Sequence, residues 1–236
     1  MNDKLEEKLV EANRLREAEQ YGESVKLYTE CLIEQIDQKD YRGQVHTLCG
    51  QSLIYKILAR KTSDAIYKRL TVALTKEAIG VLDLHIDMVD QHTQSIAYSS
   101  FADGLLMDNQ IKESLPYFEK SLAISPAEIP EKGRLKAHIG DVKYLLGEKQ
   151  IGKDLINEAL TDIRSGDMNS YPIRVWETGA LNALAKIYAI EGETQKAKDT
   201  IMESLKIATD HALTIRKKEA EEIEKKISSG DTNFSI

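Results

Sequence analysis

Pairs of small residues recur along this chain at one fixed separation. The pairs, each twelve positions apart, are Ala12 and Ser24, Ala102 and Ser114, Gly140 and Gly152, and Ala185 and Ala197. Agreement of four pairs on one spacing is not expected by chance, and self-similarity at a fixed period marks a chain built from repeats. The stretch from Tyr98 to Pro126 is the clearest copy, and the rest of the sequence consists of looser versions of it.

The composition favours helices. Apolar residues make up 42% of the 236 positions, which is enough to form a core, while the chain has only 13 Gly and 4 Pro. This scarcity of helix breakers, beside many Lys, Glu, Ala and Leu residues, is typical of a helical protein. The formal net charge of −7 provides no basic field that would attract nucleic acid.

The sequence predicts a soluble cytoplasmic protein. No apolar run approaches the roughly 20 residues that are needed to cross a bilayer. The first residues, MNDKLEEKLVEANRL, show no apolar core behind a basic leader, so we expect no signal peptide. Cys31 and Cys49 are too few for a disulfide framework, and we expect two buried thiols, not a redox pair.

The clearest copy carries the spacing of a known repeat. Its matching residues are Tyr98, Phe101, Ala102 and Leu105 for the first half, and Ser114, Phe118 and Pro126 for the second half. Over nearly its whole length the chain resembles the tetratricopeptide repeat (TPR) superfamily, in a form with repeats longer than the standard unit of about 34 residues. The resemblance implies an all-α fold, a right-handed alpha-alpha superhelix (a TPR-like solenoid) of about five helical hairpins plus a C-terminal capping helix. In this pattern the small residues let the two helices of a hairpin approach closely.

We expect one TPR-like repeat domain over residues 1–227 and a disordered tail over residues 228–236. The five hairpins are expected over residues 3–38, 40–90, 92–126, 130–165 and 171–210, with the capping helix over residues 211–227.

The second hairpin departs from the pattern. Thr62, twelve residues after Gly50, lies in a turn-like sequence, and the best second half is offered by Ala73 with Gly80. The excess of eleven residues is about three helical turns, and we expect it to be shared between the two helices. The second helix is expected over residues 63–90. The residues expected on its apolar stripe are Ile66, Leu70, Leu74, Ala78, Val81 and Leu82.

The resemblance also implies a concave groove, built mainly from the first helix of each hairpin, that receives a peptide or a partner helix. The residues aligned with groove positions are Asn13, Arg16, Gln44, Gln51, Ser99, Asp103, Arg134, Asp141, Tyr144, Asn182 and Lys186. Asn and Gln both donate and accept hydrogen bonds, so they can hold a peptide backbone whatever its side chains. Of the polar set with which co-chaperone TPR domains clamp a terminal carboxylate, only Asn13 has a counterpart.

Two short motifs resemble a phosphate-binding loop and a metal site, but neither has the residues or spacing that such a site needs. Residues 147–154, GEKQIGKD, match the start of a phosphate-binding loop but end in Asp where Ser or Thr is needed, so we expect an inter-helix turn. His85, Asp87, Asp90 and His92 do not share one helical face, and we expect a solvated helix end there, not a metal site. The sequence therefore predicts no catalytic residue, no metal and no cofactor.

These observations predict a non-catalytic module or scaffold that binds a protein or peptide in its groove. Nucleic acid and membrane are not expected as partners, and a homo-oligomer is allowed. Two alternatives are a signalling-peptide-responsive regulator that changes shape on ligand binding, and a self-assembling structural protein.

Overall fold

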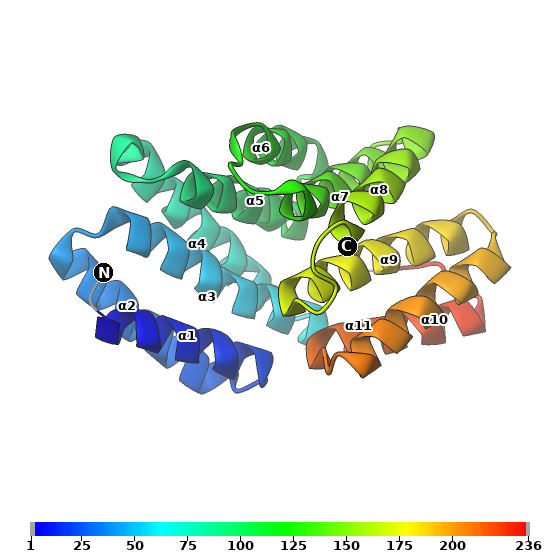
Figure 1. Ribbon diagram of the computed structural model, residues 1–236, viewed down its shortest axis with the longest axis horizontal. Coiled ribbons are helices and arrows are strands. Elements are labelled where there is room, and N and C mark those ends of the chain that lie inside the picture. Colours follow the sequence, from blue (N-terminus) through cyan, green and yellow to red (C-terminus); the bar gives the residue numbers. More distant parts are fainter. Residues whose placement is uncertain (1–2, 235–236) are drawn as a thin grey trace. The chain divides into compact units, whose positions relative to one another are not determined.

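The structure is a computed structural model that describes residues 3–234, and the described residues form eleven α-helices and one short 3-10 helix (Figure 1). The prediction of an all-α fold is confirmed. The elements are α1 (Asp3–Glu17), α2 (Tyr21–Gln38), α3 (Tyr41–Thr62), α4 (Ala65–Leu84), η1 (Ile86–Met88), α5 (Gln91–Met107), α6 (Ile111–Ile124), α7 (Ile129–Leu145), α8 (Lys149–Arg164), α9 (Tyr171–Ile190), α10 (Thr194–Asp210) and α11 (Thr214–Ser229).

The helices form two compact units, each a stack of sequential hairpins. The first unit ends at Pro126 and holds the hairpins α1–α2, α3–α4 and α5–α6. The second begins at Ala127 and holds α7–α8, α9–α10 and the last helix α11. Ser228 and Ser229, placed in the tail by the sequence, continue α11, and Phe234 packs against the last core cluster. The extent of the domain as residues 1–227 stays a prediction.

The pairs of small residues lie where the two helices of a hairpin come closest. In α1–α2 the Ser24 hydroxyl donates to the Ala12 carbonyl oxygen at 2.7 Å. In α7–α8 a Cβ added at Gly152 would lie 2.5 Å from the Gly140 carbonyl oxygen, which is closer than real contacts allow. All members of the four pairs are buried. The interpretation of these positions as helix-contact sites is therefore confirmed.

The turns inside most hairpins share one backbone conformation. Each places a single residue in the left-handed region, Glu19 at φ 59°, Asn109 at φ 62°, Gly147 at φ 94° and Gly192 at φ 77°. The following amide returns to the end of the first helix; the Glu148 amide, for example, donates to the Lys143 carbonyl. The sequence GEKQIGKD thus forms the α7–α8 turn and the start of α8, as predicted.

The second hairpin is lengthened in both helices, as predicted. α3 has 22 residues and α4 has 20, against 17 and 14 in α5 and α6. The predicted end of α4 at residue 90 is wrong, because the helix stops at Leu84 and η1 follows. Asp90 instead caps α5, where its side chain accepts a hydrogen bond from the Thr93 amide at 3.1 Å.

The inner face of α4 differs in part from the prediction, since only Ala78 and Leu82 of the expected apolar stripe are fully buried. Ala73 and Gly80, expected to meet α3, are exposed, and Ile66 is 50% exposed. Two threonines take the inner positions, since Thr71 and Thr75 are buried and each hydroxyl donates to the carbonyl four residues earlier. These local bonds satisfy the hydroxyl groups, so a search for apolar residues does not find the buried face.

We predict opposite effects for two glycine substitutions. Gly152→Ala forces α7 and α8 apart because its Cβ meets the backbone of Gly140, and we expect a loss of about 1–3 kcal/mol of unfolding free energy. Gly80→Ala is the control, since nothing lies within 4 Å of a Cβ there, and removing a flexible residue from a helix interior is expected to stabilise by about 0.5–1 kcal/mol. Urea unfolding followed by circular dichroism measures both, and a Gly152→Ala protein as stable as wild type would contradict the packing.

We also predict that both thiols are unreactive in the folded protein. Burial raises the pKa of Cys49 to about 11 and raises the pKa of Cys31. At about pH 8 little thiolate is therefore present at either residue, and the thiolate is the reactive form. A colorimetric thiol reagent is expected to react slowly with the native chain and rapidly with both thiols in denaturant. Rapid reaction of the native chain would show that a cysteine is exposed.

Candidate functional site

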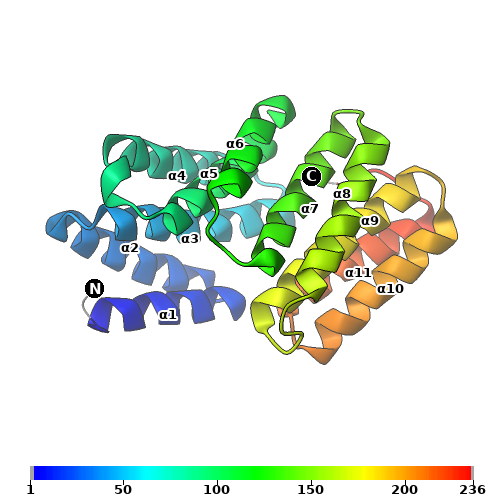
Figure 2. The same cartoon turned by 45° about the horizontal axis from the view of Figure 1, so that its top comes forward.

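The first helices of successive hairpins pack on one another and form one wall in each unit. In the first unit α3 packs on α1 and α5, and in the second α9 packs on α7 and α11. Figure 2 shows α9, α10 and α11 packed side by side at the C-terminal end. We call these the A-helix walls. All eleven side chains aligned with groove positions come from helices of these walls.

Asn13 and Arg16 are bound to each other and to the core of the first hairpin. The Tyr28 hydroxyl donates to Asn13 Oδ1 at 2.7 Å, and Arg16 Nη1 donates to the same oxygen at 3.0 Å. Asn13 Nδ2 donates to the Leu9 carbonyl at 2.9 Å. Both side chains remain half-buried. The pair therefore presents a partly accessible, pre-oriented polar edge on α1.

Three predicted positions on α3 and α5 are buried. The Gln44 side chain donates to the Gln35 carbonyl at 3.2 Å, and Gln51 donates to the Thr29 hydroxyl at 3.3 Å. Ser99 donates to the carbonyl of Ile96 in its own helix at 3.0 Å. Their hydrogen-bonding groups thus contribute to helix packing and to the local backbone.

Asp103 is joined to a lysine that the sequence did not single out. Lys56 Nζ lies 2.6 Å from Asp103 Oδ2, linking α3 to α5 across the A-helix wall of the first unit. Both side chains are largely covered. A neighbouring charge of opposite sign lowers the net field of Asp103, so any partner meets an ion pair there, not an isolated carboxylate.

The second unit carries a half-buried charged edge on α7 and α9. The Arg134 guanidinium lies 6.0 Å from the centre of the Trp176 ring, a cation–π geometry that ties α7 to α9. Asp141 stands two helical turns further along α7, and both it and Lys186 of α9 are half-buried. This edge combines both signs of charge with an aromatic ring.

Tyr144 and Asn182 are placed inside the second unit. Asn182 is 1% exposed, and its Oδ1 accepts a hydrogen bond from Ser204 of α10 at 2.7 Å. Tyr144 is also buried, and burial together with the nearby Glu191 carboxylate raises the pKa of its phenol. Both residues join helices of the second unit in this structure.

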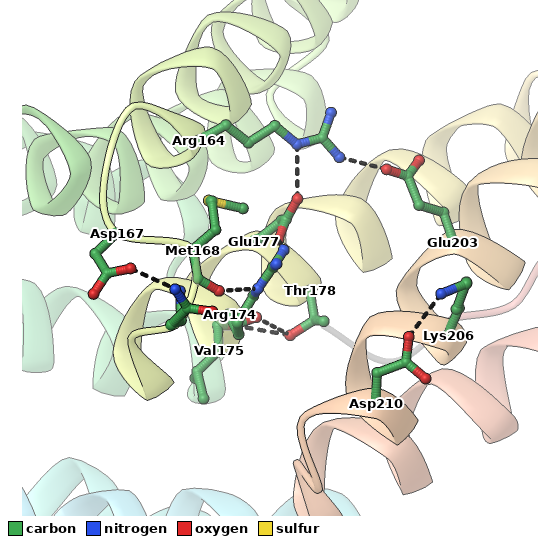
Figure 3. A network of polar contacts seen from close by, with 11 residues as sticks. Arg164, Asp167, Met168, Arg174, Val175, Glu177, Thr178, Glu203, Lys206 and Asp210 are labelled. Carbon is green, nitrogen blue, oxygen red and sulfur yellow. Dashed lines mark hydrogen bonds and ion pairs between the residues drawn. The ribbon is translucent and has the colours of Figure 1, made fainter.

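Helix α9 also carries a buried carboxylate, Glu177, that is not among the predicted site residues. Glu177 is 2% exposed, and Figure 3 shows it between two guanidinium groups. Arg164 Nε donates to its Oε1 at 2.7 Å, and Arg174 Nη1 to its Oε2 at 2.8 Å. Arg174 also donates to the Met168 carbonyl at 2.6 Å. The cluster therefore fastens the α8–α9 connection to α9.

The sequence does contain a signal for this cluster. Glu177 stands four residues after Ile173 and four before Leu181, both buried, so it occupies a core position of the α9 stripe. A carboxylate at a core position must be paired or hydrogen-bonded, because an isolated buried charge is very costly. The arginines within reach of that position would then be the candidate partners.

Metal-binding clusters and membrane-spanning helices are absent from the part of the chain that the structure describes. Within residues 3–234 no group of three or more His, Cys, Asp or Glu residues is arranged to hold a metal ion. No described helix is both long and apolar enough to span a membrane.

We predict that the two carboxylates on Arg164 differ in their effect on stability. Glu177→Gln is expected to cost about 2 kcal/mol, because it removes charged hydrogen bonds to two guanidinium groups in a buried site. Glu203 lies 2.5 Å from Arg164 Nη2 but is 49% exposed, so Glu203→Gln is expected to cost less than about 1 kcal/mol. Thermal unfolding of both variants tests this, and equal losses would show that burial does not set the strength of the cluster.

Several solved structures share this arrangement of helices, although no protein-family model and no curated protein matches the sequence. The structure is similar to that of a putative kinesin light chain from Podosopora anserina with nearly identical TPR-like repeats, with a TM-score of 0.55 and 13% identity over 89% of this chain and 98% of that chain. A variant form of the same Podosopora anserina protein matches with a TM-score of 0.56 and 13% identity, over 88% of this chain and 95% of that chain.

A further structural neighbour in the same range is BtubC (BKLC) from P. vanneervenii. Its TM-score is 0.53 with 14% identity, over 98% of this chain and 94% of that chain. At identities this low, the similarity shows a shared fold and does not show a shared partner. The chain is therefore an all-helical, TPR-like solenoid whose structural neighbours over most of its length are TPR-like repeat proteins.

Proposed function

We propose that this protein is a non-catalytic module that binds a protein or peptide partner along an A-helix wall. The observation that carries the proposal is the charged edge of the second unit, where Arg134, Asp141 and Lys186 are half-buried and the Arg134 guanidinium lies 6.0 Å from the centre of the Trp176 ring. TPR-like folds are typically protein-interaction modules, and repeat proteins bind partners on extended surfaces of stacked helices.

The chemistry of this edge suits a polypeptide. The aromatic and charged side chains of this edge offer apolar contact and directional hydrogen bonds to a partner. Because Arg134 and Trp176 are already in contact, part of the edge is ordered before binding, and a partner loses less entropy in ordering it. The edge formed by Asn13 and Arg16 in the first unit is pre-oriented in the same way.

The buried members of the predicted groove have a supporting role in this proposal. Five of these side chains hold helices together or bond to the local backbone, namely Gln44, Gln51, Ser99, Tyr144 and Asn182. Substituting them would change stability together with binding. Half-buried residues therefore give the sharper test.

The two alternative functions make different predictions for the same protein. A signalling-peptide-responsive regulator would change its radius of gyration in small-angle scattering when a captured partner segment is added. A self-assembling structural protein would give a molar mass above 26.6 kDa in light scattering without any partner. A rigid monomeric binding module would do neither.

We predict that substitutions on the wall reduce capture without unfolding the protein. The test compares the double variant Asp141→Asn/Lys186→Met with the control Lys198→Met, whose side chain is exposed on α10. Proteins captured from an extract of the source organism are quantified by mass spectrometry for each immobilised chain. Those that bind the wall are expected to be lost with the double variant and kept with the control.

Melting temperatures of both variants serve as the check on folding. Loss of capture with a melting temperature close to that of the wild type supports the wall as the binding surface. If the captured set is the same for all three proteins, the assignment of binding to this wall is wrong.

A further inference from the structure

The turn of the lengthened second hairpin concentrates positive charge. Its four cations are Arg60, Lys61, Lys68 and Arg69, and we call this set the basic tip. The single carboxylate within this stretch, Asp64, accepts a hydrogen bond from the Ile66 amide at 2.9 Å and caps α4. Other hairpin turns carry carboxylates instead, such as Glu19 between α1 and α2. The basic tip is therefore a local exception in a chain with net charge −7.

The basic tip extends past the packed part of its unit. No residue between Arg60 and Leu70 is buried, and Thr71 is the first buried residue of α4. The last turn of α5 meets α4 further along, since a Cβ at Gly104 would contact Thr75 and Val72. The first six residues of α4, about 9 Å of helix, thus lie beyond this contact.

Two cations of the tip are not used within the described chain. Lys68 and Arg69 are exposed and make no hydrogen bond or ion pair with any of residues 3–234. Lys61 is only loosely held, 3.4 Å from Glu19 and 5.9 Å from the centre of the Tyr21 ring. Clustered like charges repel one another, and the packing of this hairpin does not require these side chains.

Apolar surface accompanies the charge. Ile66 is 50% exposed on the outer side of α4. Tyr67 is half-buried and stacks on Tyr55 of α3, with ring centroids 6.1 Å apart and planes at 20°. This stacked pair joins the two helices that carry the cations and Ile66.

We propose that the basic tip is a docking surface for an acidic segment of a partner protein, in which carboxylates meet Lys68 and Arg69 and an apolar side chain covers Ile66. Arg and Lys pair with carboxylates by charge-assisted hydrogen bonds. The rest of the chain is acidic, and this favours a short peptide over a nucleic acid, whose long backbone would reach beyond the tip into a repelling field. The surface lies at the hairpin turn and so goes beyond the A-helix wall of the proposed function.

The test uses the full chain and a defined probe. A short fluorescein-labelled peptide, rich in Glu and containing one Leu, is titrated with the protein and followed by fluorescence anisotropy. A peptide with Gln in place of every Glu is the probe control. Lys68→Glu/Arg69→Glu is compared with Lys198→Glu/Lys225→Glu, which makes the same change in net charge at exposed sites on α10 and α11.

We expect the wild type to bind the Glu peptide, with affinity falling as salt is raised, and not the Gln peptide. The tip variant is expected to lose on the order of tenfold in affinity, and the matched control to lose much less. A further Ile66→Ser variant is expected to weaken binding without changing its salt dependence. Circular dichroism confirms that each variant is folded.

Several outcomes would overturn the proposal. Equal loss in the tip variant and its matched control would mean that only net charge matters. Tighter binding of duplex DNA or of phosphatidylserine vesicles through Lys68 and Arg69 would assign the tip to a different class of partner. Because Asp141→Asn/Lys186→Met leaves the tip intact, retention of peptide binding by that variant separates failure of this proposal from failure of the proposed function.

Discussion

The close approach of the two helices in each hairpin is the constraint on which the rest of the structure depends. The Gly140 carbonyl oxygen lies only 2.5 Å from the position that a Cβ of residue 152 would take, so only glycine fits there without moving α8. Where Ser24 takes the same place, its hydroxyl bonds the facing carbonyl. Helices that approach this closely leave little freedom in their crossing angle, because side-chain ridges must fit the grooves between them. The hairpins whose first helices form the A-helix walls depend on that repeated fit.

Much of the fold was readable from the sequence because this constraint acts on residue size. Small residues at one spacing indicated the phase of the repeats, and glycines such as Gly147 and Gly192 marked the turns. Part of the inner face of α4 was not readable, because Thr71 and Thr75 satisfy their hydroxyl groups in local hydrogen bonds. The pattern of residue sizes predicts helix contacts well. Buried polar residues whose hydroxyl groups bond to the local backbone look like surface residues in the sequence.

The candidate site was harder to predict for a related reason. An amide such as Asn182 suits a groove that grips a peptide, and it equally suits a buried interface between helices. The structure places it in such an interface, where its Oδ1 accepts a hydrogen bond from Ser204. Charged residues are more informative, because burial of Glu177 requires partners, whereas Lys68 and Arg69 need none and extend into solvent. Lys68 and Arg69 therefore differ from Glu177 in being charges that the packing of the described residues does not use.

Several of the turns place a residue other than glycine in the left-handed region, and this lowers the stability of the fold. Ala212 adopts φ 53° between α10 and α11, and Glu19 adopts φ 59° between α1 and α2. A side chain in this region costs on the order of 1 kcal/mol relative to glycine. Each such turn therefore holds an unused reserve of stability that a single change to glycine would release. A chain with glycine at these two positions would therefore tolerate more destabilising substitutions elsewhere without unfolding.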